Sequence, residues 1–252
     1  MAKEKKDVEK KVCEKCGGRQ FILTDEGPVP CECRQAELLK KRLKAAKIPS
    51  RYKNKTIKSF ISDDPQRKKL HLNAEAYVKG FSSSEIEMKK GLLFMGDTGC
   101  GKTHLAVGIL KNIIEKGFKG YFYNIADFIA RLRDTMGGDA DYDEMDLLEE
   151  ISKVDFLVLD DLGTEKPTEW VLDRLYTLIN LCYERNLPVV VTTNKMDIIE
   201  LENHVGKRIV SRLCEMCQII DNFPKEDYRK KDLEVHSKSV RKENPHRLKT
   251  GQ

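Results

Sequence analysis

The residues best suited to chemistry lie in one glycine-rich stretch. It fits the pattern G-x-x-x-x-G-K-T and reads Gly96-Asp97-Thr98-Gly99-Cys100-Gly101-Lys102-Thr103. Glycines permit positive φ, so that successive backbone N–H groups turn inward and surround phosphate oxygens. The lysine of this pattern reaches the outer phosphates, and the threonine hydroxyl ligates Mg²⁺. We therefore predict a nucleoside triphosphate site with Lys102 on the phosphates and Thr103 on magnesium; a glycine turn that binds nothing is the alternative.

Two adjacent carboxylates, Asp160 and Asp161, follow the apolar run from 154 to 159. A hydrophobic strand that delivers an acid to the rim of a parallel sheet is how this class of NTPase holds Mg²⁺. We predict that Asp160 binds the ion through a water molecule and that Asp161 polarises the attacking water. A simple strand cap or turn is the alternative.

Two further polar side chains fit the same site. Asn194 ends the β-rich run 187–194, where its amide would orient water against the γ-phosphate, unless it is a plain strand end. A helix over 206–217 leaves Arg208 and Arg212 one turn apart, opposite its apolar face. Arg212 either reaches the γ-phosphate bound by a neighbouring subunit or makes exposed surface pairs.

Four cysteines predict a metal site near the N-terminus. The first pair, Cys13 and Cys16, has zinc-knuckle spacing, and the second pair, Cys31 and Cys33, follows after a predicted hairpin. We predict one structural zinc ion on these four thiolates, although C-x-C spacing is less common than C-x-x-C. Unligated, reduced cysteines are the alternative, and we interpret the remaining cysteines as ordinary thiols.

A parallel sheet flanked by helices must position these side chains. His104 is predicted to continue the helix after the glycine loop, beside the nucleotide, and not to act as a base. The predicted strands are 92–95, 121–123, 154–159, 187–193 and 218–223. The predicted helices are 35–47, 65–81, the segment after Lys102, 125–132, the segment after Trp170 and 206–217, while the acidic stretch 139–150 predicts a mobile loop and a short helix.

Residues 34–58 carry strong positive charge, because ten lysines and arginines stand against Glu37 alone. Leu39, Leu43 and Ala46 give the predicted helix a thin apolar stripe, and Pro49 is expected to stop it. This basic linker helix touches nucleic acid or an acidic partner surface, or it is a solvated connector.

Composition limits the classes of function. The chain has 252 residues, 35% of them charged, and a net charge of only +5, so that a preference for nucleic acid must come from local patches. The sequence has no apolar run of 18 residues and no hydrophobic segment behind its charged N-terminus. We therefore expect a cytoplasmic protein that is neither secreted nor bound to a membrane.

Together, these motifs resemble a known family. The blocks GLLFMGDTGCGKTHLAVGI and FLVLDDLGTEKPTEWVLDRLYTLIN, the TTN at 192–194 and RIVSRL are similar to AAA+ ATPases of the bacterial helicase-loader family. That family includes DnaC- and DnaI-type loaders and the transposition helper IstB. The resemblance covers roughly residues 50–228, and the cysteine module followed by a basic helix also resembles the N-terminal region of loader-like proteins.

The resemblance implies an α/β fold with a five-stranded parallel AAA+ sheet, a central P-loop strand and no C-terminal helical lid. We divide the chain into a zinc module (1–34), a basic linker helix (35–58), an AAA+ domain (59–223) and a polar tail (224–252). The resemblance further implies ATP with Mg²⁺, ATP-dependent assembly of a homo-oligomer and an N-terminal domain that grips the hexameric replicative helicase. It also favours Arg212 as a residue acting in a neighbouring subunit.

By the same resemblance, Thr168 and Trp170 occupy positions that contact single-stranded DNA. The Trp170 ring would stack on a base, or it simply packs at the start of its helix. Asp161 departs from the family pattern, because most AAA+ proteins have glutamate there; the shorter side chain predicts slow turnover.

The sequence hypothesis is a bacterial or phage AAA+ ATPase that loads the replicative helicase onto single-stranded DNA. The first rival is a transposition helper that binds duplex DNA. A small-molecule P-loop kinase is disfavoured, because the chain has no arginine-rich lid over an acceptor. A zinc-dependent adaptor that binds ATP without hydrolysing it is the weakest alternative.

Overall fold

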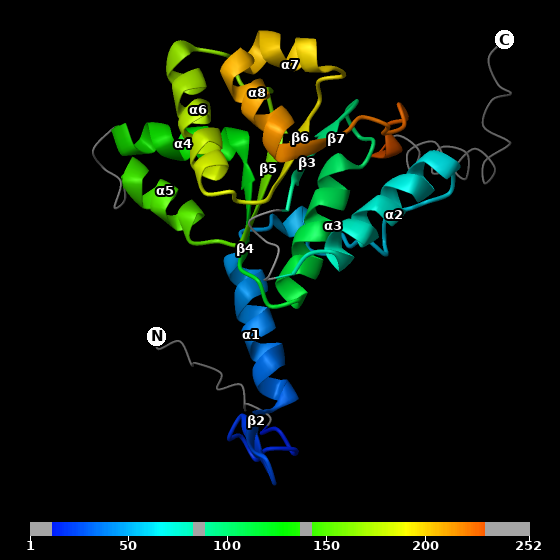
Figure 1. The fold of residues 1–252 in the computed structure, drawn as a ribbon, viewed down its shortest axis with the longest axis vertical. Coiled ribbons are helices and arrows are strands. Elements are labelled where there is room, and N and C mark those ends of the chain that lie inside the picture. Colours follow the sequence, from blue (N-terminus) through cyan, green and yellow to red (C-terminus); the bar gives the residue numbers. More distant parts are fainter. Residues whose placement is uncertain (1–11, 83–88, 137–142, 230–252) are drawn as a thin grey trace, which may run out of the picture.

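The computed structural model describes residues 12–82, 89–136 and 143–229 (Figure 1). Its centre is a five-stranded sheet with the order β4-β5-β6-β3-β7, and every neighbouring pair is parallel. The strands are β3 (Gly91–Met95), β4 (Gly120–Asn124), β5 (Phe156–Leu162), β6 (Val189–Thr193) and β7 (Cys217–Ile220). The predicted α/β fold with a five-stranded parallel sheet is confirmed. The strand that leads into the predicted P-loop, β3, is interior, but it is not the central strand that the resemblance implies, because β6 holds the middle position.

Helices cover both faces of this sheet. The helices α2 (Pro65–Lys79) and α3 (Lys102–Glu115) lie on one face. The other face carries α4 (Ile125–Met136), α5 (Glu144–Ser152), α6 (Glu169–Glu184), α7 (Ile198–Val205) and α8 (Lys207–Met216). Alternate residues of β3 show why both layers form, because Leu92 packs toward α3 and Leu93 toward the opposite layer. Strands buried on both faces are continuous apolar runs, which is the pattern that the sequence displays.

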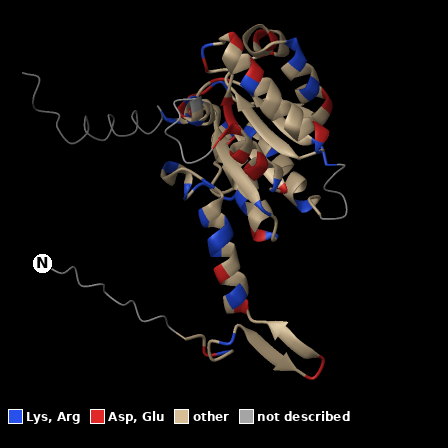
Figure 2. Ribbon diagram, turned by 90° about the vertical axis from the view of Figure 1, so that its left-hand side faces the viewer, with Lys and Arg blue, Asp and Glu red and all other residues tan. Residues whose placement is uncertain are grey.

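The N-terminal part of the described chain is a small hairpin on a helix. The strands β1 (Phe21–Thr24) and β2 (Gly27–Pro30) pair antiparallel, and α1 (Glu32–Ala45) follows. Figure 1 shows α1 extending away from the sheet with the hairpin at its far end, and Figure 2 shows Lys and Arg positions, in blue, along the helix. The predicted helix 35–47 therefore begins three residues earlier and ends two residues earlier. It ends before Pro49, because Lys47 adopts φ +59°.

The C-terminal end of α1 is attached to the sheet. Ala46 is fully buried and its carbonyl accepts a hydrogen bond from the Phe122 N–H (2.9 Å). The Lys47 ammonium donates to the Tyr123 hydroxyl (2.6 Å) and pairs with Glu150 of α5 (2.5 Å), to which Tyr123 also donates. Part of the acidic stretch thus forms α5 and anchors the linker. The loop predicted around Gly137 and Gly138 lies outside the described residues.

The sheet is followed by a segment that the sequence analysis divided between its last strand (up to 223) and a polar tail (from 224). Residues 222–229, orange to red in Figure 1, lie beside β7 and α2, and the Gln66 amide donates to the Asn222 carbonyl (2.6 Å). The rest of the predicted tail, 230–252, lies outside the described residues, as does the prediction that no lid follows. Among the described helices, none combines the length and apolar character needed to cross a membrane.

Replacing Gly108 by alanine should destabilise the protein although alanine favours helices. A Cβ at Gly108 in α3 would lie 2.7 Å from the Ile57 backbone N and 3.0 Å from the Thr56 carbonyl carbon, so backbone must move. We expect a loss of about 2 kcal/mol in the free energy of unfolding, measured by urea denaturation. The exposed Lys69→Ala variant in α2 is the control; equal stability of Gly108→Ala and wild type would contradict the close approach.

Candidate nucleotide site and cysteine cluster

The glycine loop joins β3 to α3 by a turn that only glycine makes easily. Gly96, Gly99 and Gly101 have φ of +148°, +82° and +104°, and Gly101 is the residue directly before α3. Backbone N–H groups therefore collect at the N-terminus of α3, where the helix dipole favours an anion. The Lys102 side chain is buried and its ammonium donates to the carbonyls of Gly96 (2.8 Å) and Asp97 (2.6 Å). The loop thus has the form of a phosphate-binding P-loop.

The two acids at the end of β5 occupy different environments. Asp160 is 1% exposed, and its Oδ1 accepts a hydrogen bond from the Thr192 hydroxyl of β6 (2.8 Å). Burial and the neighbouring Asp161 raise the pKa of Asp160 to about 6, while the hydroxyls of Thr103 and Thr192 oppose this rise. The structure therefore brings the two predicted magnesium ligands, Thr103 and Asp160, together at one edge of the sheet.

Asp161 is turned toward solvent by an irregular backbone. Its φ is +62°, and the β5–β6 register shifts between Leu159 and Leu162. The Asp161 N–H donates to the Thr192 hydroxyl (3.0 Å), which fixes this turn. A residue other than glycine at positive φ is uncommon and concentrates at functional sites. This bulge places two consecutive residues in different surroundings. The Asp160 side chain is buried, and Asp161 lies on the wall of a cleft.

The cleft beside the P-loop has a volume of about 630 Å³. Asn194, which directly follows β6, lines it, and the buried Asn194 Oδ1 has no hydrogen-bond partner within the described chain. A buried acceptor without a partner costs about 1–3 kcal/mol, so this amide is suited to a bound group. The predicted residues that line the cleft are Thr98, Gly99, Cys100, Gly101, Lys102, Thr103, His104, Asp161 and Asn194.

Another wall comes from residues 51–61, which span the predicted boundary between the linker (35–58) and the AAA+ domain (from 59). The residues of this wall are Arg51, Tyr52, Lys55, Ser59, Phe60 and Ile61. The Lys111 ammonium of α3 holds the segment by donating to the carbonyls of Tyr52, Lys53 and Lys55. His104 also holds this segment, because the His104 Nε2 lies 2.9 Å from the Thr56 carbonyl oxygen. Burial lowers the pKa of His104. Lys111, a lysine in the mostly apolar helix α3, is the sequence signal that could have indicated this contact.

Arg212 does not line the nucleotide cleft of its own chain. Its guanidinium donates to the Asn180 amide oxygen (3.0 Å) and to the Tyr176 hydroxyl (2.8 Å), both on α6. The guanidinium carbon of Arg208 lies 4.2 Å from the centre of the same Tyr176 ring. The half-buried Arg212 side chain therefore lies at the α6–α8 contact of its own chain, and its action on a neighbouring subunit stays a prediction.

Thr168 and Trp170 lie at the start of α6 and outside the nucleotide cleft. The Thr168 hydroxyl accepts a hydrogen bond from the Val171 N–H and so caps the helix. Trp170 is half-buried against the core, and the guanidinium carbons of Arg133 and Arg174 lie 5.6 and 6.0 Å from its ring centre. Both sequence interpretations of Trp170 thus retain support, since it packs partly and has cationic neighbours.

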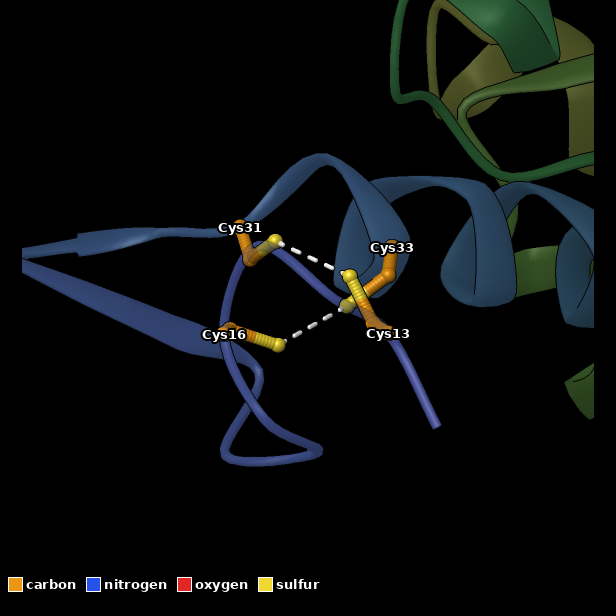
Figure 3. Close-up of side chains that lie close together, drawn as sticks. All are labelled: Cys13, Cys16, Cys31 and Cys33. Atoms are coloured by element: carbon orange, nitrogen blue, oxygen red, sulfur yellow. Dashed lines mark hydrogen bonds between the residues drawn. The ribbon is translucent and has the colours of Figure 1, made fainter. Parts of the chain in front are cut away.

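The four N-terminal cysteines converge at the base of the hairpin (Figure 3). Their sulfur atoms all lie within 4.8 Å of one another, with 3.9 Å between Cys13 and Cys31 and 3.5 Å between Cys16 and Cys33. Tetrahedral zinc with Zn–S bonds of about 2.3 Å separates sulfurs by about 3.8 Å. The Gln20 N–H also points at the Cys16 sulfur (3.3 Å). The donor set fits zinc, and α1 explains the C-x-C spacing, because Cys33 lies in its first turn.

Comparison with known proteins identifies the family. The model of IstB-like ATP binding proteins matches residues 29–235. This chain belongs to that family. Among curated relatives, the replicative helicase loader DnaC of Buchnera aphidicola (Schizaphis graminum) is 28% identical over 64% of this chain and 64% of its own length. An ATP-binding protein of insertion sequence IS5376 from Geobacillus stearothermophilus is 29% identical over 64% and 60%.

Solved structures agree with this family assignment. A crystal structure of the DnaC helicase loader has a TM-score of 0.61 and 31% identity, covering 68% of this chain and 98% of that one. AMPPCP-bound DnaA from Aquifex aeolicus (TM-score 0.58, 17% identity, 77% and 56% coverage) shares the fold alone. The domain therefore has the predicted AAA+ fold of an ATPase. The chain spans 60–64% of the curated relatives named above.

Replacing Cys16 by serine should remove the metal. We expect purified wild-type protein to hold about one zinc ion per chain, because four thiolates converge, and the variant to lose most of it. Elemental analysis after dialysis against a weak chelator measures this. Cys214→Ser, an exposed cysteine outside the cluster, should keep the ion. Zinc-free wild type, or full zinc in Cys16→Ser, would refute the site.

Replacing Asn194 by alanine should slow ATP hydrolysis while ATP binding persists. If the unpartnered amide orients the attacking water, kcat falls about 100-fold and KM changes less than about threefold. Steady-state kinetics with saturating Mg²⁺ give both parameters. Asn73→Ala, an exposed amide in α2, is the matched control. A rise in KM with unchanged kcat would instead assign Asn194 to binding.

Proposed function

We propose that this chain is an ATPase that loads the replicative DNA helicase onto single-stranded DNA during replication initiation or restart. The observation that carries the proposal is the convergence of Lys102, Asp161 and Asn194 on one cleft in an IstB-like protein. A DnaC helicase loader resembles it over nearly the whole of that chain.

The chemistry of the cleft follows from its donor groups. The P-loop N–H groups and Lys102 bind the phosphates of ATP, and Thr103 and Asp160 are suited to hold Mg²⁺, with Asp160 acting through a water molecule. Magnesium supplies charge neutralisation at the phosphates. Asp161 polarises the attacking water and Asn194 orients that water. Because aspartate is one methylene shorter than glutamate, turnover is slow, which suits a protein that uses ATP as a switch.

Assembly completes the site. Arg212 of one subunit stabilises the charge that develops on the γ-phosphate bound by its neighbour, so that ATP promotes a homo-oligomer. Its hydrogen bonds to Tyr176 and Asn180 support this role by holding the guanidinium in one orientation. ATP hydrolysis then requires a neighbouring subunit, so that the rate of hydrolysis measures the extent of assembly.

The N-terminal part supplies the partner contact. The hairpin, which the four cysteines would fix around zinc, lies at the far end of α1, away from the sheet (Figure 1), and is therefore accessible to the helicase. The basic side chains of α1 bind nucleic acid or acidic groups of the partner. Trp170, between Arg133 and Arg174, stacks on a base of single-stranded DNA, and Thr168 lies beside it.

A transposition helper that binds duplex DNA is the second candidate. The match to IstB-like proteins over residues 29–235 and the likeness to an ATP-binding protein of insertion sequence IS5376 support it. The cysteine cluster and the resemblance to a solved DnaC loader favour helicase loading. The two candidates differ in the DNA that the ATP-bound protein prefers.

A labelled single-stranded oligonucleotide should bind tightly only in ATP. Fluorescence anisotropy at fixed salt, in ATP, in ADP and without nucleotide, measures the dissociation constant. We expect ATP to tighten binding at least about tenfold, and Trp170→Ala to weaken it about tenfold through lost stacking.

The exposed Ile199→Ala variant in α7 is the control for Trp170→Ala. Preference for duplex over single-stranded oligonucleotide would support the transposition helper. Binding that ignores the nucleotide, or absence of binding, would refute the loader mechanism.

A further inference from the structure

Residues 222–229, the C-terminal segment, pack directly on the P-loop. Phe223 contacts the Phe94 ring (5.2 Å between centroids), and its Cβ lies 3.1 Å from where a Cβ at Gly96 would stand. The Tyr228 N–H donates to the Gly99 carbonyl (3.1 Å). Two loop glycines therefore face this segment, so that its position is coupled to that of the phosphate-binding loop.

Asp227 makes the contact specific. A Cβ at Gly99 would overlap the Asp227 carboxylate. This carboxylate therefore fills the space that the side chain of any larger residue at position 99 would need. The same carboxylate accepts from the Arg229 N–H (3.0 Å) and lies 3.5 Å from the Arg229 Nε. Asp227 thus holds Arg229 next to the loop while the Arg229 side chain remains 60% exposed.

Arg67 fixes the segment from the other side. Its side chain is 3% exposed, its NH1 pairs with Asp63 (3.1 Å) and Asp64 (2.9 Å), and its guanidinium carbon lies 4.8 Å from the centre of the Tyr228 ring. Its NH2 lies 3.6 Å from Glu226. Cation–π and ionic contacts therefore join the N-terminus of α2 to the segment.

Arg67, Tyr228 and Arg229 all line the 630 Å³ cleft together with Thr98 and Gly99. A guanidinium is suited to phosphate, because its planar donors match two oxygens at once. We propose that the C-terminal segment is a wall of the nucleotide site and that Arg229 binds the phosphates of a nucleoside triphosphate. Asp227 is the positioning residue for Arg229. The inference rests on the nucleotide site of the proposed function, but not on helicase loading.

Arg229→Ala in the full-length chain tests this. Equilibrium titration with fluorescent ATP and Mg²⁺ should show affinity reduced about tenfold or more, the loss expected for a charge-assisted phosphate contact. Lys225→Ala removes one positive charge from the same segment, outside the cleft, and should stay within twofold of wild type, by the same titration. Arg229→Lys should recover part of the affinity.

Thermal melting without nucleotide separates binding from folding. Arg229→Ala should melt as wild type does when nucleotide is absent and gain less than wild type when ATP is added. Should alanine loosen the segment, Arg229→Gln removes the charge at similar length and gives the same titration.

The outcomes separate the two proposals. Wild type that fails to bind ATP would refute the proposed function. Wild type that binds ATP, with Arg229→Ala and Arg229→Gln within twofold of it, would refute the role of Arg229 alone. Equal losses in Lys225→Ala and Arg229→Ala would also refute it, because general charge would then explain the effect.

Discussion

The turn between β3 and α3 is the constraint on which the nucleotide domain depends. Glycines at 96, 99 and 101 allow the chain to reverse within a few residues while its N–H groups converge. Because these glycines lack side chains, other parts of the chain can approach the loop closely. Phe60 lies 2.7 Å from where a Cβ at Gly101 would stand, and Asp227 occupies the same position at Gly99. The glycines therefore permit close packing as well as the inward turn of the backbone N–H groups.

Local patterns predicted the parts of the site that local chemistry defines. The P-loop, the acids after an apolar strand and the paired cysteines each depend on spacing within a few residues. The structure confirms the parallel sheet and the AAA+ fold, and it brings Thr103 and Asp160 together. The assigned roles of the individual site residues stay predictions, since geometry alone does not measure catalysis.

The walls of the cleft could not be predicted in this way, because they come from distant segments. Residues 51–58 carry the charge pattern of a linker, yet Lys111 binds the carbonyls of Tyr52, Lys53 and Lys55 to α3 through contacts 56 to 59 residues apart. Residues 222–229 have the composition of a polar tail, and only tertiary packing places them on the loop. The positive φ of Asp161 was equally hidden, since aspartate gives no glycine signal.

The attachment of α1 has a mechanical consequence. Lys47 ties the base of the helix to Tyr123, and the next residue of β4, Asn124, is the register partner of Asp160. A helix of 14 residues is about 21 Å long, so a tilt of about 10° at its base displaces the hairpin by about 4 Å. The base of α1 is therefore attached to β4 one residue away from the strand position that pairs with Asp160. Any shift at that edge of the sheet that tilted α1 would therefore be larger at the hairpin than at its origin.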